Sequence, residues 1–371
     1  MEENRKEKGK MTSKTVGIIT IYDLYPNFGN RLQNYAVQAV ISRLGFDVFT
    51  YSFQPHPLGL SGNIKYFLQR ASGFRLPGDG NYWRNVPPRI KAFHKFNRKY
   101  IKTKRISHIP NKSDADYFVL GSDQVWNAEW YNDMKRDMFL LTFATPEQKV
   151  CFSPSFGITN CPEEWKGYFC EQLRTFLKLS VREEAGAKII KELTGQKAVV
   201  LIDPTLMLDR EDWRKFARKP AKVDFSKPYI LSYFLGDRTE RTEHDLEQYA
   251  SQLHAQVFNL MDYEQPELYV TDPCEFLYLV DHAELVLTDS FHGCVFSFLF
   301  GKPFLLYKRV GLENMMSRME TLFEQFNLQR KYVDSGLENE LLECNYENGY
   351  KTLALEREKA LRFLKESLHV D

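Results

Sequence analysis

Short apolar runs alternate with helical patterns along most of this chain, and this alternation limits the folds that it can adopt. Residues 16–22 form a first strand-like run, residues 31–44 carry apolar side chains on one helical face, and residues 47–53 form a second run. Strands that alternate with helices are typical of βαβ units, in which neighbouring strands are parallel. The sequence therefore predicts an α/β protein built from parallel, Rossmann-like sheets.

The apolar runs form two groups, one on each side of the turn Asp203-Pro204-Thr205. The first group continues with predicted strands at 117–120, 149–153, 177–181 and 198–202, which we expect to complete one sheet, and with a helix at 162–176. The second group has predicted strands at 229–235, 256–260, 284–288 and 303–307. Because 371 residues suffice for two domains of ordinary size, we predict one sheet in each domain.

The predicted domains cover residues 15–205 and 206–345, with a basic aromatic insertion at 62–106 in the first. Residues 1–14 are charged and lack the apolar segment of a secretory signal, so we expect a disordered leader there. Residues 346–371 carry a helical pattern, which we expect to form a C-terminal helix that packs back on the first domain. Asp272, Pro273 and Glu275 stand in the order of a capping box and predict the start of another helix.

Composition narrows the classes of function. Lys plus Arg (50) nearly balances Asp plus Glu (49), which argues against a nucleic-acid partner for the protein as a whole. The six cysteines form no Cys-x-x-Cys pair, which argues against a zinc site or a disulfide framework. No apolar run is long enough to cross a bilayer. We expect a cytoplasmic protein that requires no metal and no bound cofactor.

Four polar motifs each follow a predicted strand: NFGNRLQN at 27–34, GSDQVWN at 121–127, SVRE at 180–183, and TDSFHGCVF at 288–296. In a twisted α/β sheet, ligands bind in the crevice beyond the carboxyl ends of the strands. The motifs therefore predict one cleft between the domains, with His292 at the end of a strand.

These motifs, with SPSFG at 153–157 and Asp203-Pro204-Thr205 between them, resemble the polysaccharide pyruvyl transferase family over roughly residues 16–322. The resemblance implies a GT-B-like fold, phosphoenolpyruvate as donor, and a pair of sugar hydroxyls on a polysaccharide or glycan precursor as acceptor. The products would be a pyruvate ketal and phosphate. Two alternatives stay open, because fold alone does not fix chemistry: a GT-B glycosyltransferase that uses a nucleotide sugar, and a non-catalytic glycan- or lipid-binding protein.

Ketal formation requires a proton donor and acceptor, together with cations for a carboxylate and a phosphate. His292 can donate and accept a proton near neutral pH, and the bidentate guanidinium of Arg182 can bind a carboxylate or a phosphate. Asp123 would deprotonate the acceptor hydroxyl or orient His292. The remaining predicted substrate contacts are Asn30, Arg31, Gly121, Ser122, Gln124, Ser290, Gly293 and Arg318. Structural roles compete with these: His292 as a helix cap, Arg182 as the partner of Glu183 or Glu184, and Asp123 as a turn residue.

The chain departs from the family at one position. Many members carry an arginine two residues before the motif histidine, where this chain has Ser290. Another base must then bind the donor's phosphate: Arg31, Lys308, Arg309 or Arg318. We favour Arg318, for which the structural alternative is a salt bridge with Glu313 or Glu320. Cys294, on the predicted helix, is expected to be buried and inert.

Residues 62–105 contain twelve Lys or Arg and one acid, Asp79, with aromatic residues interleaved. Two interpretations stay open for this span. It would lie on the anionic inner face of a membrane and meet a lipid-linked sugar acceptor, or it would be a solvated insertion whose helix, residues 88–100, packs its aromatic side chains on the first domain. Single-stranded nucleic acid is disfavoured by the neutral total charge.

Overall fold

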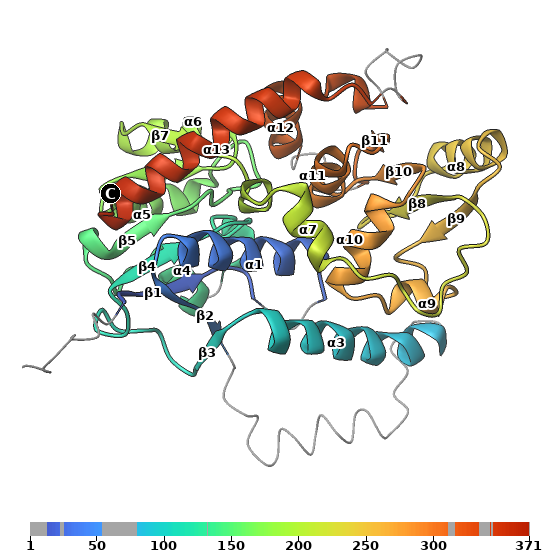
Figure 1. The fold of residues 1–371 in the computed structure, drawn as a ribbon. Coiled ribbons are helices and arrows are strands. Elements are labelled where there is room, and N and C mark those ends of the chain that lie inside the picture. Colours follow the sequence, from blue (N-terminus) through green and yellow to red (C-terminus); the bar gives the residue numbers. More distant parts are fainter. Residues whose placement is uncertain are drawn as a thin grey trace, which may run out of the picture.

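The protein is described here from a computed structural model (Figure 1). The structure describes residues 13–22, 26–53, 80–131, 133–310, 316–333, 342 and 344–370, without the side chains of 80–86, 130, 133, 134 and 330. Residues 1–12 of the expected leader and most of the basic span before residue 80 lie outside these ranges. Within them, every helix is too short or too polar to cross a membrane.

The first sheet has five parallel strands in the order β3-β2-β1-β4-β5. The strands are β1 (Thr15–Ile19), β2 (Asp47–Phe53), β3 (Thr103–Ile106), β4 (Tyr117–Leu120) and β5 (Lys149–Cys151). Val16 at the centre pairs with Val48 on one side and Tyr117 on the other, and its side chain is fully buried. Helix α1 (Phe28–Arg43) connects the parallel strands β1 and β2, as in a βαβ unit.

The second sheet is also parallel, in the order β11-β10-β8-β9. Its strands are β8 (Tyr229–Tyr233), β9 (Gln256–Asn259), β10 (Leu285–Thr288) and β11 (Phe304–Leu306), which confirms the four strands predicted in this half. Helix α10 (Pro273–Asp281) begins with the predicted capping box, because Asp272 and Glu275 each accept a hydrogen bond from the other's backbone N–H. Helix α11 (Phe291–Phe300) follows β10 and is buried along its whole length.

The other helices surround the two sheets. They are α3 (Gly80–Tyr100), α4 (Asp133–Phe139), α5 (Glu163–Leu173), α6 (Glu184–Thr194), α7 (Arg210–Phe216), α8 (Glu240–Gln252), α9 (Pro266–Tyr269), α12 (Ser317–Phe326) and α13 (Glu347–Leu368). Short 3₁₀ turns lie at Ala128–Trp130, Pro146–Gln148, Pro204–Met207 and Gln329–Lys331.

The expectation that residues 177–181 and 198–202 extend the first sheet is wrong. Strands β6 (Leu179–Val181) and β7 (Ala198–Val200) form a separate two-stranded parallel sheet. The reason lies in Ser180, whose hydroxyl donates to Cys151 O at 2.7 Å and accepts from Ser153 N at 3.1 Å. Hydrogen bonds of this hydroxyl thus take the place of the backbone-to-backbone hydrogen bonds that would join β5 and β6 in one sheet. Strand β3, inside the basic span, was missed because TKRI lacks an apolar run.

The two halves share one hydrophobic core. Phe28, the first residue of α1, stacks on Phe276 of α10 with ring centroids 4.6 Å apart. On one side of the molecule α13 returns to the first half, where Lys178 pairs with Glu366 at 2.6 Å and Tyr117 lies beside His369 (Figure 1). The fold prediction is therefore confirmed: the protein is an α/β protein with two Rossmann-like parallel sheets in a GT-B-like arrangement, and its C-terminal helix packs back on the first.

Candidate active site between the two sheets

The first turn of α1 supplies one wall of the site. Asn27 caps this helix, accepting a hydrogen bond from Asn30 N at 3.0 Å, and this fixes the helix start beside the end of β1. The side-chain amide of the buried Asn30 donates to Asp123 Oδ2. The predicted residues Asn30 and Asp123, 93 positions apart, therefore lie together.

Asp123 follows β4 in a left-handed conformation, with φ at 74°. The preceding residue is held from α1, because Gln33 accepts from Ser122 N at 3.0 Å and donates to Thr20 at 2.8 Å. Ser122 in turn donates to Ser153 O at 2.8 Å. This set of buried hydrogen bonds fixes the backbone after β4 and so aims the Asp123 carboxylate at the space between the sheets.

Arg182, which follows β6, lies between two carboxylates. It donates to Asp203 Oδ2 at 2.7 Å, and its other terminal nitrogen lies 3.4 Å from Asp123 Oδ1. Burial opposes the charge of Arg182, but Asp203 and Asp123 outweigh it and raise the pKa of the guanidinium. The structure thus pairs Arg182 with aspartates, and not with Glu183 or Glu184 as in the alternative considered from the sequence.

Asp203 is the residue at which these contacts meet. Its side chain is fully buried, and its Oδ1 accepts from Thr205 N and Thr205 Oγ1 at 3.0 and 2.7 Å. Its Oδ2 lies 2.7 Å from Arg182 Nη1 and 3.7 Å from His292 Nε2. Burial alone would raise the pKa of Asp203, but the charges of His292 and Arg182 hold it well below the usual range. Asp203 is therefore a permanent anion that orients both neighbours.

His292 is the second residue of α11, whose N-cap is Ser290. Its ring lies against the backbone of α1, because a Cβ placed on Gly29 would be 2.0 Å from His292 Nδ1. Its Nε2 has no hydrogen-bond partner among the described residues. His292 is not the cap of its own helix, so the capping role considered from the sequence belongs to Ser290 instead.

Arg318, the second residue of α12, is a buried cation that forms no ion pair with a carboxylate among the described residues. With the Gln124 amide turned so that its oxygen faces the guanidinium, Gln124 accepts from Arg318 Nη2 and Nη1 at 2.7 and 2.5 Å. Burial and the nearby Arg182 lower the pKa of Arg318 to about 9. Both guanidinium groups lie over the ring of Phe291, 4.5 Å away for Arg182 and 5.9 Å for Arg318. The predicted ion pair with Glu320 does not form, and Glu313 lies outside the described residues.

Several buried polar atoms at this place have no partner within the described parts of the chain. Glu183 uses one carboxylate oxygen to accept from Ser155, Phe156 and Gly157, and its other oxygen is unpartnered. The remaining unpartnered atoms are Arg182 Nε, His292 Nε2, Ser317 Oγ and Arg318 Nε. Because buried polar groups are almost always hydrogen-bonded, unpartnered atoms grouped in this way make these residues the candidate for binding a polar ligand.

The predicted contacts divide into two groups. Asn30, Asp123, Gln124, Arg182, His292 and Arg318 converge as described, whereas Gly121, Ser122, Ser290 and Gly293 fix the backbone. A Cβ on Gly293 would lie 2.5 Å from Thr288 Oγ1, and one on Gly121 2.4 Å from Phe152 O, so both glycines allow close approach of neighbouring segments.

The other proposed bases are placed differently. Arg309 donates to Asp289 at 2.9 Å, and Asp289 also accepts from Leu235 N and Gly236 N. Lys308 is exposed, and the buried Arg31 lies over the ring of Tyr22 at 5.0 Å. Cys294 is fully buried, and burial raises its pKa well above the ordinary value, as expected for an inert thiol.

Sequence reasoning missed the roles of Asp203, Glu183 and Phe291. A signal existed for Asp203, since it follows the strand run 198–202 just as the other motifs follow theirs. None existed for Phe291, because an apolar residue at the start of a helix reads as core.

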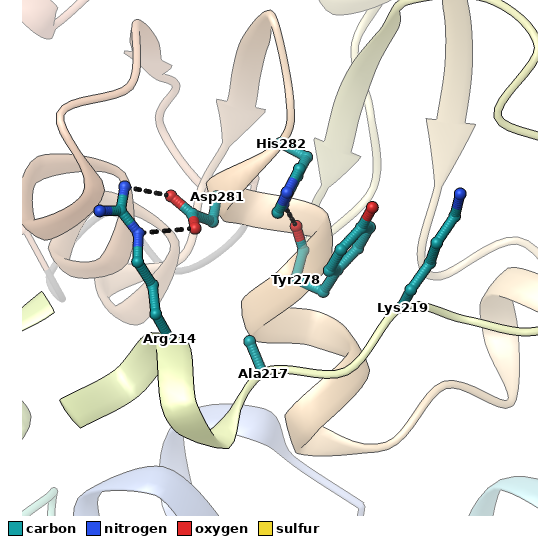
Figure 2. A pocket seen from close by; sticks show the side chains of 6 residues that line it. All are labelled: Arg214, Ala217, Lys219, Tyr278, Asp281 and His282. Atoms are coloured by element: carbon teal, nitrogen blue, oxygen red, sulfur yellow. Dashed lines mark hydrogen bonds and ion pairs between the residues drawn. The ribbon is translucent and has the colours of Figure 1, made fainter. Parts of the chain in front are cut away.

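A separate surface pocket of about 540 Å³ lies on α7 and α10 and shares no lining residue with the site (Figure 2). Figure 2 shows the Arg214 guanidinium turned toward Asp281, which it meets at 2.9 and 3.0 Å. His282 stacks on Tyr278 with ring centroids 3.9 Å apart. In the pocket lining Arg214 and Asp281 are thus paired with each other, whereas the convergent, unpartnered groups lie in the buried site between the sheets.

Two parallel sheets with buried polar residues at the carboxyl ends of their strands define a Rossmann-like α/β protein. A family model described as polysaccharide pyruvyl transferase matches residues 27–308, and the chain belongs to that family. A search of the curated proteins finds no match.

The solved structures to which the chain is similar are distant in sequence. A putative UDP-N-acetylglucosamine 2-epimerase from Listeria monocytogenes has a TM-score of 0.48 and 11% identity, covering 97% of this chain and 98% of that one. Arabidopsis thaliana UGT89C1, complexed with UDP-L-rhamnose, has a TM-score of 0.45 and 13% identity, covering 96% of each chain. A functionally uncharacterized protein from Klebsiella pneumoniae has a TM-score of 0.44 and 11% identity, covering 87% of this chain and 93% of that one.

Proposed function

We propose that the protein transfers the pyruvate unit of phosphoenolpyruvate to two hydroxyls of a sugar, forming a pyruvate ketal on a polysaccharide or glycan precursor. The observation that carries the proposal is Arg318, a buried guanidinium that has an amide, not a carboxylate, as its partner and a pKa lowered to about 9. A buried cation in this state favours an incoming anion, which would restore the charge balance. The donor of this family's reaction is such an anion.

The donor carries two anionic groups, and the site offers two guanidinium groups. Arg318 has both Nη atoms on a neutral amide oxygen, and Arg182 keeps its Nε unpartnered while Asp203 and Asp123 hold its other nitrogens. We assign the phosphate and the carboxylate of the donor to these two residues. Arg318 then serves in place of the arginine that is absent at position 290, where Ser290 caps α11.

His292 is the proton donor in this proposal. Its Nε2 lies 3.7 Å from the permanent anion Asp203, which orients the ring, and it has no hydrogen-bond partner among the described residues. Protonation of the donor's methylene carbon by His292 breaks the carbon–carbon double bond and leaves positive charge on the adjacent carbon. The carboxylates of Asp123 and Asp203 stabilise that charge.

The remaining bonds follow in two additions. One sugar hydroxyl attacks the cationic carbon and gives its proton to Asp123 or to the now neutral His292. The carbon–oxygen bond to phosphate then breaks, and the second hydroxyl attacks the same carbon. Of the two acceptor protons, one replaces the proton that His292 gave to the methyl group, and the other leaves with the phosphate. Atoms and charge balance without an oxidant or a reductant.

The test is phosphate release from phosphoenolpyruvate with a panel of lipid-linked and free β-galactosides and N-acetylhexosamines. We expect acceptor-dependent release by the wild type and by His244→Ala, an exposed histidine of α8, and none by His292→Ala. Thermal stabilisation by phosphoenolpyruvate should accompany it. Stabilisation by a nucleotide sugar without any response to phosphoenolpyruvate would replace the proposal with a glycosyltransferase, and no response to either would indicate a non-catalytic protein.

A further inference from the structure

Helix α3 has a basic face that the site does not use. From residue 80 to residue 113 the sequence contains no Asp or Glu. On α3 the exposed positions include Lys91, Lys95, Arg98 and Lys99, spaced so that they lie along one side of the helix. We call these four residues the basic face of α3.

The opposite side of α3 is fixed to the rest of the protein. Phe93 and Phe96 are buried, with Phe93 against Phe28 of α1 and Phe96 against Phe216 of α7. Arg89 is buried between the halves, where it lies over Phe28 and donates to the backbone of Tyr269. The helix cannot turn its aromatic side outward, so the basic face is a permanent outer surface.

The basic face is not neutralised by the protein. Lys102 and Lys104, just beyond the helix, pair with Asp47 and Asp114 at 2.5 and 3.6 Å. Lys91, Lys95 and Arg98, by contrast, form no ion pair within the described ranges, and Lys99 contacts only the ring and hydroxyl of Tyr100. Asp272 and Glu275, at the start of α10, are bound by Arg218.

We propose that this basic face docks the protein on an anionic lipid bilayer. The exposed row of cations is complementary in charge to an anionic bilayer. Such a surface attracts each basic side chain that lies within a Debye length of it. Single-stranded nucleic acid fits less well, because Phe93 and Phe96 are buried and the half-buried Tyr100 already packs on Phe216. Figure 1 shows α3 on the side of the molecule opposite α13, so only one face of the protein would meet the bilayer.

Docking would also orient the site. Arg89 links α3 directly to Phe28, which precedes Gly29 and Asn30 at the site. An acceptor carried on a lipid would therefore approach the first turn of α1 from the docked side. This last consequence rests on the proposed function, whereas docking itself does not.

The test is co-sedimentation with vesicles of phosphatidylcholine alone and of phosphatidylcholine mixed with phosphatidylglycerol, at low and at high salt. We expect binding only to the anionic vesicles, weakened by salt. The triple substitution Lys91→Glu, Lys95→Glu and Arg98→Glu should weaken it at least about a hundredfold, from about fivefold for each base removed. The matched control Lys188→Glu, Lys191→Glu and Lys197→Glu, exposed at and after α6, changes the charge equally and should bind as the wild type does.

Three outcomes would overturn the proposal: no binding of the wild type to anionic vesicles at low salt, equal loss in both triple variants, or binding of single-stranded nucleic acid in place of vesicles. Melting temperatures of the variants show whether a loss reflects unfolding. Phosphate release with a water-soluble acceptor separates the two proposals, because the α3 variant should keep that activity while losing the vesicles.

Discussion

The ring of His292 occupies the space that a side chain at position 29 would need. A Cβ on Gly29 would lie 2.0 Å from Nδ1 and 2.5 Å from Cγ of the imidazole. Gly29 belongs to α1 of the first half and His292 to α11 of the second, so this contact joins the halves at the site itself. Neither residue can change without moving the other.

Gly29→Ala is expected to reduce phosphate release about a hundredfold, because it pushes the imidazole about an ångström or more out of place. In the interior of a helix, a change from Gly to Ala ordinarily stabilises the protein by about 1 kcal/mol. A lower melting temperature of Gly29→Ala would therefore indicate the steric clash with the imidazole. Gly167→Ala, in α5 with open space around its Cα, is the control and should leave activity unchanged. Full activity in Gly29→Ala would show that the placement of His292 does not matter.

Asp203→Asn should lower the free energy of unfolding by about 3–5 kcal/mol, because it leaves the buried Arg182 without its closest counter-charge. It should also reduce phosphate release, since His292 loses the anion that orients it at 3.7 Å. Urea unfolding and the turnover rate of the folded variant check the two effects. An unchanged turnover rate with reduced stability would restrict Asp203 to a structural role.

Asp203 should contribute to the pH dependence of the unfolding free energy. Its pKa in the folded protein is held below the unfolded value of 3.8, so its contribution is fully present above pH 3.8 and is lost as the pH falls below that value. The difference in unfolding free energy between wild type and Asp203→Asn should therefore shrink in acid. Urea titrations across this range measure it, and a constant difference would contradict the pairing.

Arg318→Met should raise the stability of the unliganded protein by about 1 kcal/mol or more, because it removes a buried charge whose partner is the amide of Gln124. The same change should abolish stabilisation by phosphoenolpyruvate in a thermal-shift assay. Arg309→Met is the comparison, since that arginine already pairs with Asp289 and should not alter the response to the donor. If phosphoenolpyruvate still stabilised Arg318→Met, its anionic groups would have to bind at residues other than Arg318.

Donor affinity should also fall as the pH rises through about 9, the lowered pKa of Arg318. Below that pH the guanidinium is charged before the donor arrives, whereas above it binding must take up a proton. Isothermal titration in buffers of different ionisation enthalpy measures that uptake. No proton uptake above pH 9 would exclude Arg318 as the donor's ligand.

Thiol labelling should distinguish the cysteines. Cys344 is exposed, whereas Cys151, Cys274 and Cys294 are buried, and burial raises the pKa of each. Iodoacetamide should therefore modify Cys344 first without loss of activity, and Cys294→Ala should keep its turnover rate. Labelling of Cys294 in the native protein would give that thiol an accessible role.

Local sequence was sufficient for much of the fold. The second sheet and the capped start of α10 follow from apolar periodicity and from the Asp272-Pro273-Glu275 order. Strand β3 could not be found in this way, because it is an edge strand with three exposed residues and carries no pattern. The separation of β6 from β5 depends on a single hydroxyl, that of Ser180, which no periodicity reveals.

For the site, the motifs supplied residues but not their relationships. Asp123, Arg182 and His292 could be named because each follows a strand. That Asp203 joins two of them, and that Arg318 has an amide partner, depends on side chains from α12 and from the turn after β7 meeting in space. Such meetings are set by packing between the halves, which a single sequence does not report.

The return of α13 to the first half has a consequence for synthesis. Arg357 donates to Leu206 O and Leu208 O at 2.6 and 2.7 Å, so residues made late in translation close over a turn made about 150 positions earlier. Until α13 leaves the ribosome, these carbonyls lack the partners that they have in the folded chain. Folding of the first half can therefore be completed only after about 150 further residues have been added, when α13 becomes available.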